Sequence, residues 1–275
     1  MPLTTIIMYK PLSNTFLLTM LVLDINAQKL PSVQKESVRA PQQVTIDGKF
    51  KEWGSSLQAH NNATEISYTI TNDDNNLYLI AQAADEMVIN KILRGGLTLA
   101  IQKTGEKDDK NAVAITYPVS GYAFSVHFNF HIGRTLDTSV ERVSAMVENN
   151  NKLIEQHIKF IGVKGISGVD SLISIYNEDN IKAAGLLGLN RGYTLELCLP
   201  LKYLDLSAGN EPKFAYHIIL NGYKRESTII SINNQDGTPA TGPRIERLLS
   251  SAAQMDAAVS ARTDFWGEYT LAKKP

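Results

Sequence analysis

The stretch that decides the fold spans residues 44–85 and reads VTIDGKFKEWGSSLQAHNNATEISYTITNDDNNLYLIAQAAD. Within it, Ile66, Tyr68 and Ile70 alternate with polar residues, and a second apolar run over 77–83 follows a turn of Asn and Asp. Period-two alternation on both sides of such a turn predicts a β-hairpin in which each strand buries one face. A lone hairpin is marginally stable in water, so we expect it to belong to a larger sheet.

Similar alternation returns along most of the chain after this hairpin. It is cleanest over 122–131, where every second residue is apolar or aromatic. Two segments, about 138–150 and about 243–260, instead place apolar residues at helical spacing, whereas 87–96 fits irregular chain or one short helical turn. The other expected strands cover residues 97–101, 112–117, 154–163, 172–176, 182–187, 193–200, 213–220, 223–232 and 266–271.

Many short strands separated by turns are typical of an antiparallel β-sandwich. The chain has 275 residues, and its sequence contains no internal repeat and no domain-sized linker. We therefore predict an all-β fold, an antiparallel β-sandwich with two inserted helices, that forms one domain over residues 44–275.

Bulk composition limits the partners. The net charge is −1, so no basic surplus favours nucleic acid. The single cysteine, Cys198, lies inside an apolar alternating run, where a buried small hydrophobe is expected rather than a nucleophile.

The N-terminal residues 1–27 have the pattern of a signal peptide. A short apolar core over 15–23 follows Lys10 and precedes the small residue Ala27. This core is too short to cross a bilayer comfortably, so no stable membrane span is expected. A buried N-terminal strand or helix is the alternative. We expect export to the periplasm, the cell surface or the medium, with residues 28–43 as a flexible lead-in.

Several of these residues resemble a known family. Ile46-Asp47-Gly48, Glu52-Trp53 and the run from Asp73 to Leu79 are similar to the opening of the family 9 carbohydrate-binding modules and their DOMON-like relatives. The resemblance continues over 193–200 and 265–271, and so spans most of the chain after residue 40. It implies an antiparallel sandwich that binds glycan without catalysing a reaction.

The resemblance also implies roles for single residues. Trp53 and Trp266 occupy places that look structural in the family. Relatives bind calcium structurally, and Asp85, where the second strand of the hairpin ends, is the first candidate ligand for such an ion. No other cofactor is implied.

The sequence contains no nucleophile elbow, P-loop, dinucleotide fingerprint or zinc signature. His127 and His131 share one strand face about 13 Å apart, too far to hold one metal ion. The acidic pairs Asp73-Asp74, Asp108-Asp109 and Glu178-Asp179 could each supply half of a glycosidase site or of a calcium shell, although solvated turns also explain them.

Sugar binding in this family depends on stacking tryptophans and acidic residues. The corresponding segments here, Asn90 to Leu99 and Ser260 to Asp264, contain no aromatic residue. We therefore expect no tight binding of free mono- or disaccharide ends. Any glycan would bind elsewhere, and the candidate ligand-binding residues are Arg94, Tyr122, Tyr176 and Tyr223. Tyr117 is a further tyrosine that could stack on a sugar if it is exposed.

Three functions follow from this reading. The first is an exported, non-catalytic module that binds glycan weakly or at a non-standard site. The second is a structural or protein-binding envelope module of the same fold that has lost the sugar site. The third, an enzyme acting on carbohydrate, ranks last because no acid–base constellation stands out.

Overall fold

The computed structural model describes residues 29–54, 57–119, 128, 130, 139–210, 212–224 and 242–274. The predicted signal peptide, Tyr122, both histidines of the 122–131 run and most of the predicted strand over 223–232 lie outside these residues.

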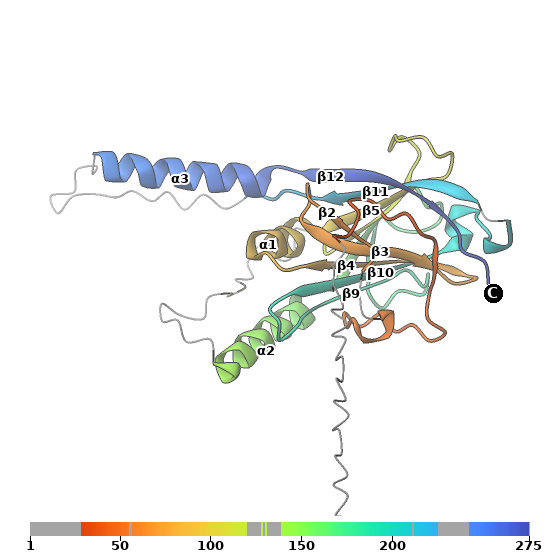
Figure 1. Ribbon diagram of the computed structural model, residues 1–275, viewed down its shortest axis with the longest axis horizontal. Coiled ribbons are helices and arrows are strands. Elements are labelled where there is room, and N and C mark those ends of the chain that lie inside the picture. Colours follow the sequence, from red (N-terminus) through yellow and green to blue (C-terminus); the bar gives the residue numbers. More distant parts are fainter. Residues whose placement is uncertain are drawn as a thin grey trace, which may run out of the picture.

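The strands of the described chain form two sheets that pack face to face (Figure 1). Sheet A has the strand order β1-β3-β4-β10-β9, with β2 paired to β3, and sheet B has the order β12-β11-β5-β6-β7-β8. All pairings are antiparallel except β1 with β3. Sheet A comprises β1 (Val38–Arg39), β2 (Ala59–Asn61), β3 (Ile66–Asn72), β4 (Asn76–Ala83), β9 (Lys182–Leu187) and β10 (Tyr193–Pro200). Sheet B comprises β5 (Leu97–Gln102), β6 (Val113–Tyr117), β7 (Phe160–Lys164), β8 (Leu172–Ser174), β11 (Lys213–Leu220) and β12 (Thr263–Thr270).

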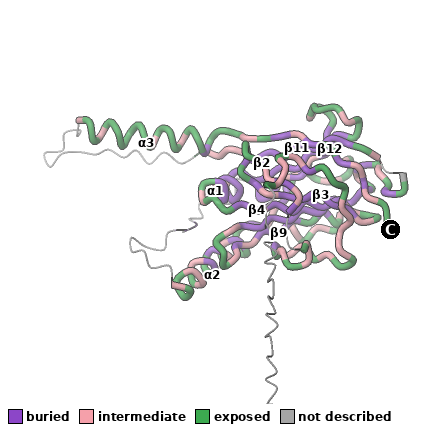
Figure 2. Tube along the Cα trace, in the orientation of Figure 1, coloured by how far each residue is buried: buried purple, intermediate pink, exposed green. Residues whose placement is uncertain are grey.

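The β-hairpin predicted around the Asn- and Asp-rich turn is confirmed as β3 and β4, and its inward face forms part of the core. The main apolar core lies between the two sheets, where the tube in Figure 2 is almost entirely buried. Tyr68 of sheet A and Tyr216 of sheet B join the layers through their hydroxyl oxygens, which are 2.8 Å apart. Tyr68 also contacts Phe265 with a ring-centroid distance of 5.0 Å. Alternation therefore predicted the buried face of these strands correctly.

The prediction of an all-β fold with two helices is wrong in one respect, because the described chain has three α-helices: α1 (Glu86–Gly95), α2 (Val140–His157) and α3 (Pro243–Ser260). Three short 3₁₀ helices are Lys51–Trp53, Leu201–Leu204 and Ala208–Asn210. The segment over 87–96, expected to be irregular or one short helical turn, forms the longer helix α1. Helix α2 continues into the region where a strand was expected to begin at residue 154. All three α-helices lie at one end of the sandwich, and α3 extends away from it (Figure 1). None of the described helices is both long and apolar enough to cross a membrane.

Residues 34–40, predicted as part of a flexible lead-in, are bound to sheet A. The side-chain amide of Gln34 donates to the carbonyl of Ile70 at 2.8 Å and accepts from its N–H at 2.7 Å. Val38–Arg39 then pairs with the end of β3. The side-chain amide thus occupies the place of a neighbouring peptide group.

The segment after residue 40 crosses the outer face of sheet A and builds a second small core around Tyr78, Ile80 and Cys198. Its anchor is Glu196, a fully buried carboxylate on β10. The backbone N–H groups of Asp47 and Gly48 donate to one of its oxygens at 2.8 and 2.6 Å.

The indole N–H of Trp53 donates to the other oxygen of Glu196. Burial raises the pKa of Glu196, and the hydrogen bonds it accepts only partly offset that effect. Trp53 is half-buried against the second core rather than within the main one. Its predicted structural role fits this contact.

Candidate functional site

The outer face of sheet B gathers polar and aromatic side chains around Trp266. The antiparallel register places Trp266 on β12 directly opposite His217 on β11. Their neighbours Phe265 and Tyr216 belong to the core, so period-two alternation turns Trp266 and His217 outward. The two rings stack with centroids 4.1 Å apart and an interplanar angle of 17°.

His217 is held on both sides by carboxylates. Its Nδ1 lies 3.0 Å from Asp109 Oδ1, and its Nε2 lies 3.1 Å from Asp264 Oδ1. Arg262 Nη2 is 3.4 Å from the same Nε2, so that nitrogen has a partner in either protonation state of the ring. The side-chain amide of Gln102 donates to the carbonyl of Asp108 at 3.0 Å and so secures the loop that carries Asp109. The imidazole is therefore fixed as a support for Trp266.

The charges of the cluster stabilise the ionised form of Asp264. Burial alone would raise the pKa of this carboxyl, but hydrogen bonds from His217 and Arg262, together with their charges, outweigh it and hold the pKa below its usual value. His217 is only 2% exposed. A histidine between two aspartates has the residue types of an acid–base group, but this ring is covered by its neighbours and cannot reach a substrate. The cluster is a scaffold for the tryptophan.

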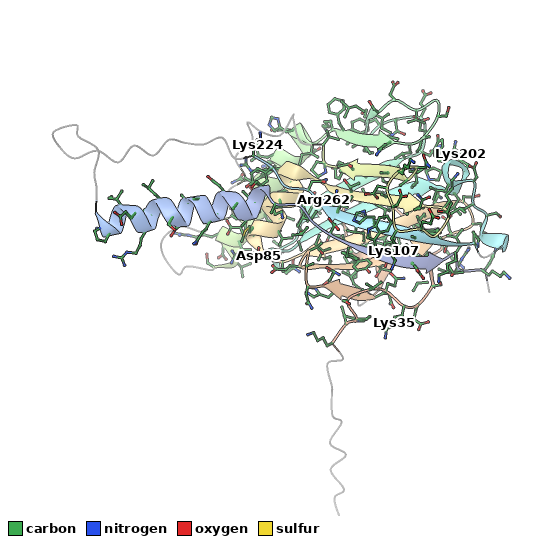
Figure 3. The ribbon with its side chains drawn as sticks, turned by 90° about the horizontal axis from the view of Figure 1, so that it is seen from above. Lys35, Asp85, Lys107, Lys202, Lys224 and Arg262 are labelled. Carbon is green, nitrogen blue, oxygen red and sulfur yellow. The ribbon has the colours of Figure 1, made fainter. Side chains whose placement is uncertain are left out.

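A groove of about 610 Å³ runs along the β12 edge beside this stack. Trp266 lines the groove and His217 does not. Charged side chains surround it: Lys35, Lys107, Lys213 and Glu268, of which Lys213 and Glu268 form an ion pair at 2.5 Å. Lys107 and Arg262 lie over the same face of the sheet in Figure 3. An aromatic ring with one supported face, surrounded by hydrogen-bonding groups in an open groove, suits an amphipathic ligand such as a sugar ring.

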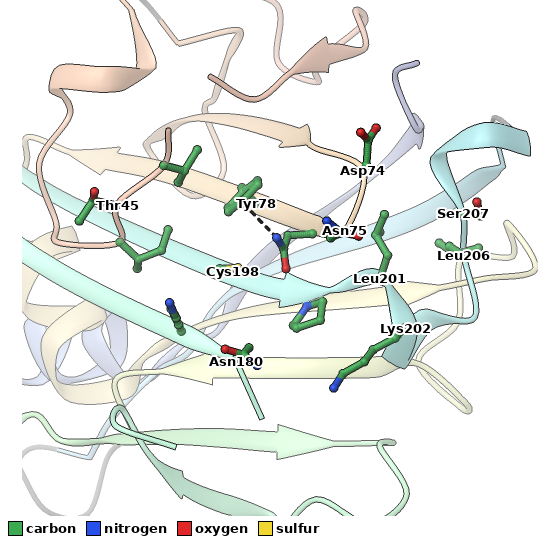
Figure 4. A pocket seen from close by; sticks show the side chains of 15 residues that line it. Thr45, Asp74, Asn75, Tyr78, Asn180, Cys198, Leu201, Lys202, Leu206 and Ser207 are labelled. Carbon is green, nitrogen blue, oxygen red and sulfur yellow. Dashed lines mark hydrogen bonds between the residues drawn. The ribbon is translucent and has the colours of Figure 1, made fainter. Parts of the chain in front are cut away.

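A larger groove, of about 860 Å³, lies on the outer face of sheet A (Figure 4). Its lining is mostly polar and includes Asp74, Asn180 and Lys202, while its aromatic residue, Tyr78, is buried. Burial raises the pKa of Cys198, at its base, to about 12, so this thiol is not a nucleophile at neutral pH. This groove offers hydrogen bonds but no aromatic ring for stacking.

Of the three candidate ligand-binding residues that the structure describes, two lie together. Arg94 on α1 places its guanidinium 5.6 Å from the ring centroid of Tyr223, which follows β11. Tyr176, after β8, is 75% exposed and contacts Lys159 instead. Tyr117 is 2% exposed and belongs to the core, so it lacks the exposure that stacking on a sugar requires. Tyr122 lies outside the described residues.

Asp85 has a structural role that the metal prediction did not include. Its Oδ1 accepts hydrogen bonds from the backbone N–H groups of Met87 and Val88, at 2.8 and 3.0 Å, and so caps the N-terminus of α1. Among the described residues, no group of three or more His, Cys, Asp or Glu side chains could hold a metal ion. Calcium at Asp85 stays a prediction.

Sequence reasoning missed His217, Asp264 and Arg262 as neighbours of Trp266. A signal was present, since His217 is a polar residue among the apolar residues 214–220 of its strand. What the sequence alone did not provide was the pairing of β11 with β12, which joins the two rings. No protein-family model and no curated protein matches this chain.

Proposed function

We propose that this chain is an exported, non-catalytic β-sandwich module that binds glycan at the groove beside Trp266. The observation that carries the proposal is the stack of Trp266 on a buried, doubly anchored histidine. A ring held in this way loses little conformational freedom when a sugar packs on it, which favours affinity. The resemblance to family 9 carbohydrate-binding modules supports glycan binding in general, while the choice of this groove rests on the stack alone.

The shape of the groove also favours one kind of glycan. An open groove along a sheet edge accommodates an internal stretch of a polysaccharide chain better than a chain end, which needs an enclosed pocket. The surrounding lysines can donate hydrogen bonds to sugar hydroxyl groups, and the carboxylate of Glu268 can accept hydrogen bonds from them. We therefore expect longer oligosaccharides to bind and free mono- and disaccharides to bind poorly.

Calorimetry on the mature protein tests this proposal. Cellohexaose and xylohexaose are titrated beside glucose, cellobiose and xylobiose, and a bound hexasaccharide is expected to show a dissociation constant between about 10 μM and 1 mM, or about −7 to −4 kcal/mol. If neither hexasaccharide binds, an array of cell-wall oligosaccharides extends the search.

Two variants locate the binding surface. Trp266→Ala should abolish hexasaccharide binding, whereas Tyr176→Ala removes another exposed aromatic and should leave it intact. Circular dichroism confirms that both variants are folded. Binding that survives Trp266→Ala would refute the proposed groove, and tight disaccharide binding at or below about 10 μM would restore the binding mode of the family.

A second candidate function is a protein-binding envelope module. The observation that favours it is α3, which extends from the sandwich with Leu248, Leu249 and Met255 about half exposed. Exposed apolar side chains on a projecting helix are typical of association surfaces. A mature protein that binds no glycan on a broad array would favour this second function over the first.

A further inference from the structure

The edge strand β9 carries a backbone binding surface between two asparagine side chains. At one end, the side-chain amide of Asn151 on α2 donates to the carbonyl of Leu187 at 3.0 Å and accepts from its N–H at 2.9 Å. Both backbone groups of Leu187 therefore point away from β10. Since the backbone of an antiparallel strand alternates with period two, Ala183 and Gly185 also direct their N–H and C=O groups toward this free edge.

At the other end of this edge an asparagine covers the backbone carbonyl alone. The side-chain amide of Asn177 donates to the carbonyl of Ile181 at 2.6 Å. Between these two amides, Ala183 and Gly185 present two N–H groups and two C=O groups for which the described residues supply no hydrogen-bond partner. Backbone groups in such a row form the template to which another strand can add.

A groove of about 400 Å³ lies along this open edge, bounded by β9, α2 and the end of β8. Ile154, Ile158 and Ile175 form its apolar part, on the side of the sandwich core. Lys152 and Glu155 of α2 supply charged side chains at the same groove. A strand lying in the groove would thus find an apolar side for alternate side chains and a polar side for the others.

Comparison with two other sheet edges, at β3 and β12, supports a specific role for this one. On β3, the backbone of Ile70 is covered by the side-chain amide of Gln34. On β12, Asp264 and Glu268 place charges along the edge, which discourages the addition of a strand. The open part of β9 reads Ala183-Ala184-Gly185, with no charge and no bulky side chain. Small residues allow another backbone to approach closely.

We propose that β9 binds an extended peptide by strand addition at Ala183 and Gly185, between Asn151 and Asn177. The peptide would alternate apolar and polar residues, with an apolar side chain directed toward Ile154 and Ile158. Its main chain would exchange hydrogen bonds with the four open edge groups, so a proline at a pairing position would prevent binding. This peptide site is separate from the Trp266 groove and does not depend on glycan binding.

A labelled peptide of seven residues, Ser-Thr-Val-Thr-Val-Thr-Ser, is a suitable probe. Fluorescence anisotropy with the full mature chain should give saturable binding with a dissociation constant below about 1 mM. A second peptide, in which proline replaces the central threonine and both valines, should bind at least about tenfold more weakly, because it lacks the N–H groups that strand addition needs.

Ala183→Pro is the matching change in the protein. It removes an N–H group that faces away from β10, so it costs no bond of the β9–β10 ladder and is compatible with an edge strand. Its peptide affinity should fall at least about tenfold. Ala184→Ser is the control, because it changes the neighbouring residue and keeps every edge group, and it should bind as the native chain does.

Amide hydrogen exchange measured by NMR on the native chain tests the same site without substitutions. In the free protein, the amides of Ala183 and Gly185 should exchange faster than those of Ala184 and Leu186, which pair with β10. The peptide should slow exchange at Ala183 and Gly185 selectively. Equal protection of all four amides in the free protein, no selective slowing, or full binding to Ala183→Pro would each overturn the proposal.

Discussion

At the scale of single residues, Glu196 explains why the Asp47-Gly48 and Trp53 motifs occur together, because its carboxylate binds both. Its two oxygens accept hydrogen bonds from the backbone of Asp47 and Gly48 and from the indole of Trp53. The glycine is needed because Gly48 has φ of +81° and a Cβ there would lie 2.8 Å from Leu186. A few residues around one buried carboxylate thus hold the N-terminal segment on sheet A.

Removing that carboxylate should destabilise the domain. Glu196→Ala leaves three N–H donors without their acceptor in a covered site, and we expect a loss of about 2–5 kcal/mol in the free energy of unfolding. Urea denaturation followed by circular dichroism measures it. Glu52→Ala is the control, since that half-buried carboxylate accepts one backbone hydrogen bond, from Thr45, and should cost no more than about 1 kcal/mol. Equal losses in the two variants would contradict the assigned role of Glu196.

Asp73 makes stability depend on pH. Burial alone would raise the pKa of this carboxyl, but hydrogen bonds from the Tyr78 hydroxyl and from the amides of Asn75 and Asn76 outweigh it and hold the pKa below its usual value. A lowered pKa stabilises the folded state when the group is ionised. The contribution is full above the unfolded pKa of about 3.9 and is lost as the pH falls through the folded pKa.

Asp73→Asn tests this dependence. The difference in unfolding free energy between the native chain and this variant should be largest above pH ~5 and should shrink as the pH falls below ~4. Urea denaturation between pH 2.5 and 7 measures it, in steps of about half a pH unit. A difference that does not change with pH would show that Asp73 acts through turn geometry and not through its charge.

At the scale of elements, alternation predicted the hairpin well and α1 poorly. The strands β3 and β4 have both a period of two and a turn of Asn and Asp between them. In α1 the buried residues are spaced as in a helix, but they occupy a single short run directly after a strand. Asp85, which marks the start of that helix, was interpreted as a metal ligand because of the family resemblance. An aspartate directly before a run with helical spacing is a typical helix N-cap, so the sequence already contained the signal for α1.

Asp85→Ala should lower stability by about 1 kcal/mol through the loss of the helix cap. Asp85→Ser can still cap the helix and should recover most of that loss. Thermal melting with calcium and with a chelator separates this role from metal binding. A melting temperature that rises with calcium in the native chain, but not in Asp85→Ser, would support the calcium prediction and show that capping is not the only role of Asp85.

At the scale of the whole molecule, the order of the strands decides where the site lies, and the sequence alone does not reveal that order. The sequence resemblance gave Trp266 a structural role and did not mark it as a binding residue. His217, on which Trp266 stacks, and Asp109, which holds His217, are distant from Trp266 in the chain and come to it only through the arrangement of β12, β11 and β5 in sheet B. The open edge of β9 likewise depends on α2 returning beside it. The contacts that fix His217 and Leu187 join distant parts of the chain, whereas Arg262–Asp264 and Asn177–Ile181 are local pairs.

Because α3 projects from the sandwich, we expect its exposed apolar residues to contribute little to the free energy of unfolding. The helix is mostly exposed along its length (Figure 2), and among its residues only Val259 is buried. Replacing Leu248, Leu249 and Met255 together by Gln keeps the helix propensity and removes the exposed apolar groups. We expect this triple variant to change the free energy of unfolding by less than about 1 kcal/mol, because these side chains are about half exposed.

Val259→Ser serves as the matched control at the base of the same helix. It replaces a side chain that is 4% exposed, and we expect a loss of about 2 kcal/mol or more. Urea denaturation of both variants gives the comparison, and analytical ultracentrifugation of the triple variant shows whether the removed groups mediate association. A triple variant that unfolds as easily as Val259→Ser would mean that α3 packs on the sandwich in solution, and the protein-binding alternative would then lose its supporting observation.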